Sequence, residues 1–110
     1  MATTPEPPYL AVIFTNRRAG WGDPPTDAAY CAAGARMDEL AKTIPGYIGI
    51  ESARSDDGTG ITVSYWEDED AIARWRSDPE HLEVQASGRD DWYEWFELRV
   101  ARVERARSFS

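Results

Sequence analysis

Residues 61–75 read ITVSYWEDEDAIARW, and this stretch decides how the chain folds. Its first half is β-branched and aromatic, which is typical of a β-strand that ends at Trp66. The acids at 68–70 follow at once, and acids in the first turn of a helix complement the positive end of its dipole. The stretch therefore predicts a strand that leads directly into a helix, with Ile72 and Trp75 on the inner face of that helix.

Two further strands, at residues 9–15 and 47–53, are predicted before this strand–helix unit. Residues 47–53 and the strand at 60–66 flank a turn at 55–59 that is rich in residues tolerant of positive φ, so these two strands are expected to pair as a hairpin. The run at 9–15 is almost continuously apolar, which predicts a first strand buried on both faces.

A loop and a helix are predicted between the first strand and the hairpin. Residues 17–25 contain two glycines and two prolines, which indicates a long irregular loop, and Trp21 makes this loop a candidate lid. Thr26 is the expected cap of the following helix, whose apolar residues recur at spacings of 3 and 4 over residues 30–44. A Pro-Gly pair follows and ends this helix.

The C-terminal third of the chain predicts a second helical segment and a last strand. Asp78 is placed to cap a helix that runs towards Trp92. The last strand is expected over residues 95–105, with an irregularity near Ala101. The order β-α-β-β-α-β is the ferredoxin-like α+β arrangement, a four-stranded antiparallel sheet with both helices on one side.

Length and composition limit the classes of partner. The 110 residues predict a single domain over residues 9–110, preceded by a Pro-rich, poorly ordered tail at 1–8. The net charge of −8 argues against nucleic acid as a partner. One histidine and one cysteine, Cys31, cannot form a closed zinc site, and Cys31 is expected to be a small, buried and inert residue. No stretch resembles a signal peptide or a membrane span, so we expect a soluble cytoplasmic protein with no metal and no membrane partner.

Large apolar residues occupy both faces of the predicted sheet. Helices cover only one face, so polar residues are expected on the other, yet adjacent positions that point to opposite faces are both large and apolar. Covering such a surface is worth ~25 cal/mol per Å² of apolar area, which predicts a two-fold homodimer with the sheets packed face to face. Local packing of these aromatic residues against loops is the alternative. The pairs are Ile13 and Phe14, Tyr65 and Trp66, and Trp95 and Phe96.

Six short motifs, taken in order, resemble one known family. They are Pro45-Gly46-Tyr-Ile-Gly49, Ile61-Thr-Val-Ser-Tyr-Trp-Glu67, Ala71-Ile-Ala-Arg-Trp75, Glu80-His-Leu82, Gly88-Arg-Asp-Asp-Trp-Tyr93 and Val100-Ala-Arg-Val-Glu104. In order and spacing they are similar to the antibiotic biosynthesis monooxygenase domain over residues 9–109, and in particular to the small single-domain bacterial members of the dimeric α+β barrel superfamily. The resemblance implies a homodimer with a pocket in each subunit between the sheet and the second helical region. It also implies a class that contains haem-degrading oxygenases and oxygenases that act on aromatic polyketides without metal or flavin.

The haem-degrading branch of the family is matched only in part. According to the resemblance, it uses an asparagine on the first strand, and a tryptophan and a histidine on the helical region. Trp75 matches the tryptophan, but the histidine belongs at 84–85, whereas this chain has His81. The asparagine position holds Phe14, with Asn16 two residues later on the same face. Haem is therefore the alternative cofactor, and His81 reaches its iron only if the helix is oriented differently.

The cofactor-independent branch requires a bound phenol or quinol, a base, and a group that stabilises the resulting anion. His81 is the candidate base or orienting group, because the positive end of its helix favours the neutral ring. Arg89 and Asn16 are the candidate anion or hydroxyl partners. On a helix, Gln85 and Gly88 lie on the same side as His81, and the glycine leaves room for a flat ligand.

Each of these residues also has a purely structural interpretation. His81 can bond solvent or a nearby acid, Arg89 can pair with neighbouring acids, and the aromatic residues can simply form the core. We expect an enzyme that oxidises a small aromatic or quinol-type metabolite with O₂ and without a cofactor. A haem-binding or haem-degrading monooxygenase and a non-catalytic small-molecule-binding dimer are the alternatives. The candidate substrate-binding residues are Tyr65, Trp66, Trp75, Gln85, Gly88 and Trp92.

Overall fold

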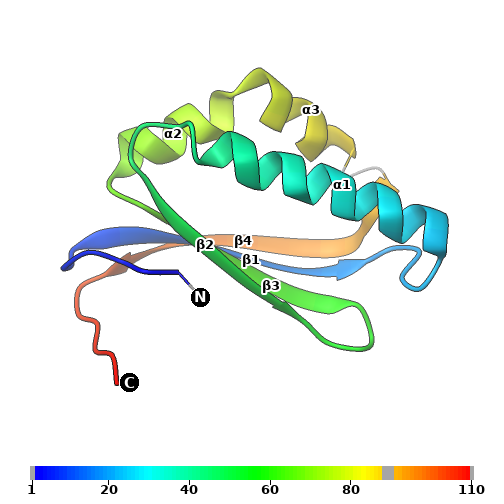
Figure 1. Cartoon of the computed structure of the whole chain (residues 1–110), viewed down its shortest axis with the longest axis horizontal. Helices are drawn as coiled ribbons and strands as arrows, with labels where there is room; N and C mark the ends of the chain where they lie inside the picture. Colours follow the sequence, from blue (N-terminus) through cyan, green and yellow to red (C-terminus); the bar gives the residue numbers. More distant parts are fainter. Residues whose placement is uncertain (1, 88–90, 110) are drawn as a thin grey trace.

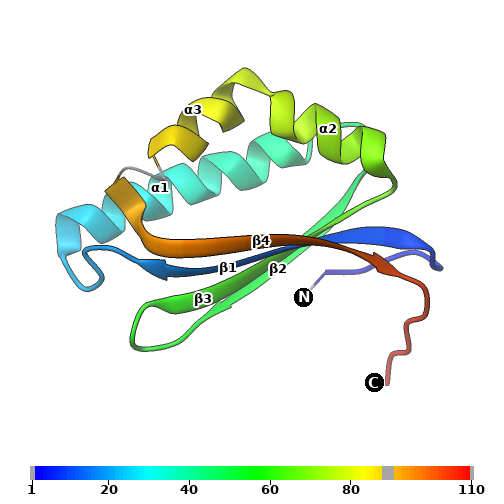
Figure 2. The ribbon, with the colours of Figure 1, turned by 180° about the vertical axis from the view of Figure 1, so that it is seen from behind.

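Four strands form one antiparallel sheet, and three helices cover one of its faces, in the part of the chain that the computed structural model describes, residues 2–87 and 91–109 (Figures 1 and 2). The strand order β2-β3-β1-β4 confirms the predicted ferredoxin-like α+β fold. None of these helices combines the length and the hydropathy needed to cross a membrane. The elements are β1 (Tyr9–Arg18), α1 (Pro24–Ala41), β2 (Tyr47–Arg54), β3 (Thr59–Trp66), α2 (Glu69–Ser77), α3 (Pro79–Ser87) and β4 (Tyr93–Val103).

The connection between β1 and α1 is shorter than predicted. β1 continues to Arg18 instead of ending at residue 15, because its last residues pair with both β3 and β4. The cap of α1 is Asp23, whose side chain accepts a hydrogen bond from the Thr26 amide, so the prediction that Thr26 is the cap was wrong. The two prolines then occupy the first turn, where a missing N–H leaves no hydrogen bond unmade. The loop predicted at 17–25 is thus reduced to residues 19–23. On the helix that follows, Cys31 is exposed, so the prediction that it is buried was wrong; its side of α1 faces solvent.

Local sequence signals determine the hairpin and the starts of the two later helices as predicted, while α3 ends at Ser87 and the rest of its predicted course towards Trp92 falls partly on residues 88–90, outside the described residues. β2 and β3 pair around a turn in which Gly58 has φ +88°, a conformation that favours glycine. Asp68 Oδ1 accepts from the Ala71 amide at 2.9 Å and caps α2, while Asp78 Oδ1 accepts from the His81 amide at 3.1 Å and caps α3.

The last strand lies two residues earlier than predicted, over Tyr93–Val103. Its register with β1 is regular through Ala101, which faces Ala11, so the predicted irregularity at this position was wrong. The register shift lies instead between Arg17 and Arg18, opposite the start of β4, where β1 leaves the sheet to enter the loop.

The core between the sheet and the helices is centred on Trp66. Its side chain is fully buried and packs with Ala41, Ala71 and Ile72. The indole Nε1–H donates to Ser64 Oγ at 2.9 Å, so the one polar atom of this buried ring has a partner.

The opposite face of the sheet is covered only in part. Both termini lie on this side (Figures 1 and 2), and the Ala2 amide donates to Glu51 Oε1 at 3.1 Å. The predicted poor order of the tail at 1–8 stays a prediction. Apolar residues on both faces remain exposed in the single chain, with Ile61 at 47% and Trp95 at 46% on the face away from the helices.

Candidate functional site

A cavity of about 360 Å³ lies between the sheet and the helices. Residues of all four strands form its floor, and residues of α1, α2 and α3 form its roof. Phe96 and Leu98 line it and are 44% and 49% exposed, so the wall along β4 stays accessible to solvent. The cavity brings together five of the predicted site residues: Trp66, Trp75, His81, Gln85 and Trp92.

His81 is held in one orientation by its neighbours. Its ring stacks on Trp75 with centroids 3.9 Å apart and an interplanar angle of 16°, and Trp75 in turn stacks on Trp66. Nδ1 lies 2.8 Å from the Trp75 carbonyl oxygen, which can only accept, so Nδ1 carries the hydrogen. In the neutral ring Nε2 is then the hydrogen-bond acceptor.

The neutral form of His81 is favoured chiefly by burial. Burial lowers the pKa of His81 below its usual value, and the bond to the Trp75 carbonyl and the charge of Asp78 oppose this only in part. The expected direction of the pKa shift is confirmed, but desolvation is the main cause. A neutral imidazole at the wall of an apolar cavity can accept a proton from a bound acid.

A second polar group in the cavity wall consists of Tyr30 on α1 and Tyr93 at the start of β4, which we call the tyrosine pair. Their hydroxyl oxygens are 2.9 Å apart, and Arg54 Nη2 donates to the Tyr30 oxygen at 3.1 Å. Burial and the bond to Tyr30 raise the pKa of Tyr93 far above its usual value, so this phenol stays protonated.

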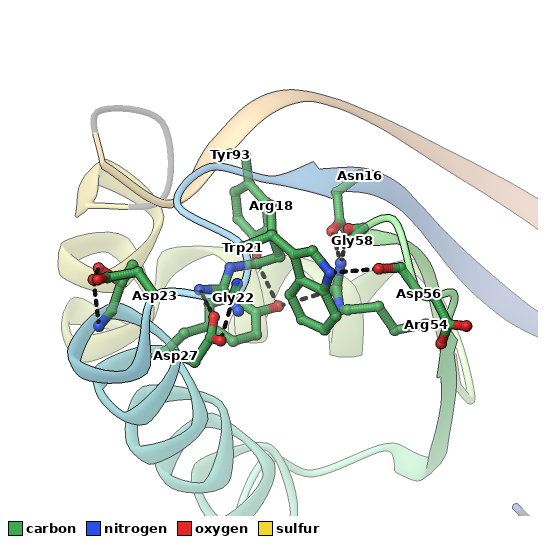
Figure 3. Close-up of polar contacts among 12 residues, drawn as sticks. Asn16, Arg18, Trp21, Gly22, Asp23, Asp27, Arg54, Asp56, Gly58 and Tyr93 are labelled. Carbon is green, nitrogen blue, oxygen red and sulfur yellow. Dashed lines mark hydrogen bonds and ion pairs between the residues drawn. The ribbon is translucent and has the colours of Figure 1, made fainter.

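The arginine cluster, which consists of Asn16, Arg18, Asp27 and Arg54, contacts the tyrosine pair through Tyr30. Figure 3 shows the four residues of the cluster together with Tyr93. Asn16 and Arg18 are 0% and 2% exposed. Arg54 Nη1 donates to Asn16 Oδ1 at 2.9 Å, and Arg18 Nη2 donates to Asp27 Oδ1 at 3.2 Å. The Arg18 guanidinium also lies 3.8 Å from the centre of the Tyr30 ring. Asn16 Nδ2 and Arg18 Nε are buried without a partner among the residues described.

Several predicted site residues lie elsewhere. Asn16 is on the predicted face of β1, but it belongs to the arginine cluster and does not line the cavity. Tyr65 does not line the cavity either, because side chains alternate along β3 and its ring packs edge-on against Tyr9 on the opposite face. Gly88 and Arg89 lie outside the described residues.

The candidate lid residue Trp21 covers the arginine cluster and not the cavity. Its Nε1–H donates to the Asp56 carbonyl at 2.7 Å, and its ring packs against Gly58 in the β2–β3 turn (Figure 3). The loop is thereby fixed to the hairpin.

Sequence reasoning missed five polar residues of the cavity wall: Tyr30, Asp38, Thr62, Ser64 and Tyr93. Tyr30 belongs to the apolar spacing of α1 and therefore looked like a core residue. Burial raises the pKa of Asp38, but its place in the sequence, among charged residues of an amphipathic helix, gave no signal of this.

Comparison with known proteins gives matches over most of the chain. Residues 21–87 match the family described as antibiotic biosynthesis monooxygenase. The uncharacterized protein YqjZ of Bacillus subtilis is 46% identical over 109 residues, which cover 99% of this chain and 91% of that protein. Jasmonate monooxygenase ABM of Pyricularia oryzae is 39% identical over 98 residues, which cover 86% of this chain but only 43% of that protein.

Solved structures share the fold at low sequence identity. A single-site mutant of SnoaB, a cofactor-independent oxygenase from Streptomyces nogalater, superposes with a TM-score of 0.72 at 18% identity, covering 92% of this chain and 95% of that one. A dimeric ferredoxin-like protein of unknown function from Thermobifida fusca has a TM-score of 0.73 at 12% identity, covering 94% and 99% of the two chains. At these identities the likeness concerns the fold alone.

Proposed function

Because the chain belongs to the antibiotic biosynthesis monooxygenase family, we propose that it oxidises a small aromatic or quinol-type metabolite with O₂ and without a cofactor. The observation that carries this proposal is the aromatic cavity with the neutral ring of His81 in its wall. The SnoaB neighbour, a cofactor-independent oxygenase, supports the same class of chemistry.

The substrate itself supplies the electrons in such a reaction. Loss of a proton from a phenol, or from a CH₂ group activated by the ring, gives an anion that reduces O₂. In the balanced reaction a CH₂ group becomes C=O, or a quinol with a ring C–H becomes a hydroxyquinone. In both cases one oxygen atom of O₂ enters the product and the other leaves as water, so all four electrons come from the substrate. The protein has to bind the flat ring, accept the proton and stabilise the anion.

The cavity supplies the first two of these functions. Trp75 and Trp92, which are half-buried in the cavity wall, offer aromatic surface for a flat ring, whereas Trp66 is fully buried and supports Trp75 from behind. His81 is the proposed base, and Gln85, one turn further along α3 and also in the wall, orients the substrate. Asn16 acts on the site only through its bond to Arg54, so we assign it a positioning role. The predicted roles of Gly88 and Arg89 stay predictions.

Oxygen uptake tests the proposal. Dihydroxynaphthalenes and anthrones are the first substrates to assay, and jasmonate is added because a relative is a jasmonate monooxygenase. His81→Phe keeps a flat ring to stack on Trp75 and removes both nitrogens, so we expect the rate to fall by roughly 10²–10⁴ while folding is retained. Tyr9→Phe, which removes a hydroxyl on the other face of the sheet, is the control and should leave the rate unchanged.

Three outcomes contradict parts of the proposal. An unchanged rate in His81→Phe means that His81 is not the base. A Soret band on addition of haem, lost in His81→Phe, supports the haem-binding alternative. Binding of these compounds without any oxygen uptake supports a non-catalytic binding protein on the same scaffold.

We also propose that the protein is a homodimer that buries the sheet face away from the helices. Ile61 and Trp95 on this face are about half exposed, and the Thermobifida fusca neighbour is a dimeric ferredoxin-like protein. Sedimentation at micromolar concentration should show a dimer for the wild type and for Ala32→Glu on the exposed side of α1, but a monomer for Trp95→Glu. A monomeric wild type contradicts the proposal.

A further inference from the structure

We propose that the tyrosine pair binds the anionic oxygen of the substrate, with the arginine cluster supplying the positive charge behind it. This inference rests on the proposed function, because it assigns a second part of the same cavity. It narrows the substrate class to aromatic compounds that carry an ionisable hydroxyl group or a ring carbonyl that becomes an enolate.

Of the two hydroxyl hydrogens of the tyrosine pair, one has no acceptor among the described residues. The two hydroxyls of Tyr30 and Tyr93 hold two hydrogens, and one of them forms the 2.9 Å bond between the two oxygens. Arg54 is the other partner of Tyr30 and can only donate, so it takes neither hydrogen. In the described part of the chain no other acceptor lies within bonding distance, and in either direction of the bond one hydroxyl hydrogen remains for a ligand.

The charge behind the pair favours an anion as that ligand. The guanidinium groups of Arg18 and Arg54 lie 3.8 and 5.5 Å from the centre of the Tyr30 ring. Asp27 forms an ion pair with Arg18, whereas Arg54 forms none with the acids that the structure describes. Two cations against one carboxylate leave the arginine cluster with a net positive charge, and its effect on a ligand in an apolar cavity is stronger than in water. Asp38, the acid in the cavity wall, lies eight residues beyond Tyr30 on α1, about two helical turns away from the tyrosine pair.

Arg54 is held in place before any ligand binds. Its Nη1 donates to Asn16 Oδ1 and to the Gly58 carbonyl, at 2.9 and 2.6 Å, while Nη2 donates to Tyr30. Donors that need no reorganisation are the ones that stabilise a developing negative charge best. When Tyr30 is the donor to Tyr93, the guanidinium polarises the Tyr30 hydroxyl, so that each bond in the chain from Arg54 through Tyr30 to Tyr93 strengthens the next one, and Tyr93 donates to the ligand.

The tyrosine pair and His81 then play complementary parts. His81 stacks within the group of Trp66 and Trp75, whereas Tyr93 packs edge-on against Phe14, and no ring contact joins the two groups among the described residues. A substrate that spans the cavity therefore meets a proton acceptor on one side and a donor backed by positive charge on the other. A hydrocarbon of the same shape makes neither contact.

A chromophoric phenol tests this without any turnover. The absorbance of 4-nitrophenol reports whether the bound molecule is ionised, and nitrobenzene serves as the analogue without an ionisable oxygen. In the wild type, bound 4-nitrophenol should ionise at lower pH than the free compound. Tyr93→Phe should reduce the preference for the anion by roughly tenfold or more, since a hydrogen bond to a charged group is lost while the ring stays.

Two further variants test whether the hydrogen bonds that link Arg54, Tyr30 and Tyr93 cause the preference for the anion, and not the packing of the rings. Tyr30→Phe keeps the Tyr93 hydroxyl but breaks its link to Arg54, so we expect a partial loss of anion preference. Tyr9→Phe removes a hydroxyl bonded to Thr4 outside the cavity and should change nothing. Repeating the titration in a His81→Phe background excludes proton transfer to the imidazole as the cause. Nitrobenzene affinity should stay unchanged in all of these variants except His81→Phe. The thermal midpoint should stay unchanged in Tyr9→Phe and should fall slightly in Tyr93→Phe and Tyr30→Phe, because each of these removes a hydrogen bond of the tyrosine pair without unfolding the protein.

The inference and the proposed function fail in different ways. Wild type that does not bind 4-nitrophenol, or that ionises it at the pH of the free compound, overturns the inference even if oxygen uptake is observed. Anion preference that survives in both Tyr93→Phe and Tyr30→Phe overturns it as well. A preference that is lost in Tyr93→Phe, in a protein that takes up no oxygen with any substrate, supports the anion site and contradicts the oxygenase.

Discussion

Gly46 lies in the turn just before β2 and close against α2, and substituting it should displace this helix, which carries Trp75. Its φ is +94°. A Cβ built at this position lies within 3.0 Å of the Ala71 Cβ in α2, closer than real Cβ atoms approach, whereas the next atom, Ala71 Cα, is 3.6 Å away. Gly46→Ala therefore has two separate costs, the backbone conformation and the clash with one methyl group.

The two costs can be estimated independently. A left-handed φ costs an L-residue about 1–2 kcal/mol, and overpacking a core costs about 1–3 kcal/mol, so Gly46→Ala should lower the free energy of unfolding by about 2–5 kcal/mol. Gly22 is a matched control, because it has φ +90° and a Cβ added there meets no other atom within 4 Å. Gly22→Ala should show only the cost of the backbone conformation, about 1–2 kcal/mol.

A double-mutant cycle isolates the clash. Ala71→Gly removes the methyl group that Gly46→Ala meets, and alone it costs about 1 kcal/mol in helix propensity, with a further loss from the buried methyl. In the double variant the clash is absent, so the coupling should be favourable by about 1–3 kcal/mol. Equilibrium urea unfolding at one protein concentration measures all four proteins. Additive free energies, or a Gly46→Ala variant no less stable than Gly22→Ala, refute the reasoning.

Three further predictions concern the site and its surroundings. Burial lowers the pKa of His81 below 6.5, so the stabilisation that the neutral imidazole provides is complete above that pH and is lost as the pH falls towards the folded-state pKa. The midpoint of urea unfolding should therefore fall less steeply with decreasing pH in His81→Phe than in the wild type. The same pH dependence in both proteins contradicts this prediction. Asp27→Asn leaves the buried Arg18 without its carboxylate partner. Because Asp27 is 31% exposed, the free energy of unfolding should fall by about 3 kcal/mol, the low end of the range for broken buried ion pairs. A fall no larger than that for a fully exposed ion pair contradicts this prediction. Trp21→Phe keeps the ring against Gly58 but removes the bond to Asp56, so unfolding free energy should fall by ~1 kcal/mol, whereas no change shows that the bond is unimportant.

The fold was predictable because local signals determine most of it. Asp68 and Asp78 each precede a helix that they cap, and Gly58 provides the turn of the hairpin. These signals act over three or four residues and can be recognised in a single sequence. The order of strands and helices then left few topologies to consider.

The end of β1 was not predictable in the same way. Arg17 and Arg18 precede a stretch rich in glycine and proline, and two charged residues there are typical of a loop. Arg18 is nevertheless buried, because Asp27 and the Tyr30 ring compensate its charge. Both partners lie in the next helix, and nothing in the local pattern identifies them.

The candidate site likewise contains one residue that local sequence identifies and several that only the tertiary structure brings together. His81 was recognisable because it is the only histidine and stands in the first turn of a capped helix. The tyrosine pair joins residues 63 positions apart, and Arg54 bonds Asn16 across 38 positions. Such contacts depend on the register of the sheet and on where α1 lies over it, which a single sequence does not specify.

The two polar parts of the cavity differ in how the fold holds them. His81 is fixed by a bond to the carbonyl of Trp75 only six residues away, so its orientation depends on the local geometry of α2 and α3. The tyrosine pair is fixed by contacts between α1, β2 and β4, so it forms only when the whole sheet is assembled. The proton acceptor of the cavity, His81, thus depends on local structure, whereas its hydrogen-bond donor, the tyrosine pair, depends on the tertiary structure of the whole domain. Loosening the sheet should therefore weaken the binding of anions before it alters the stacking of His81 on Trp75.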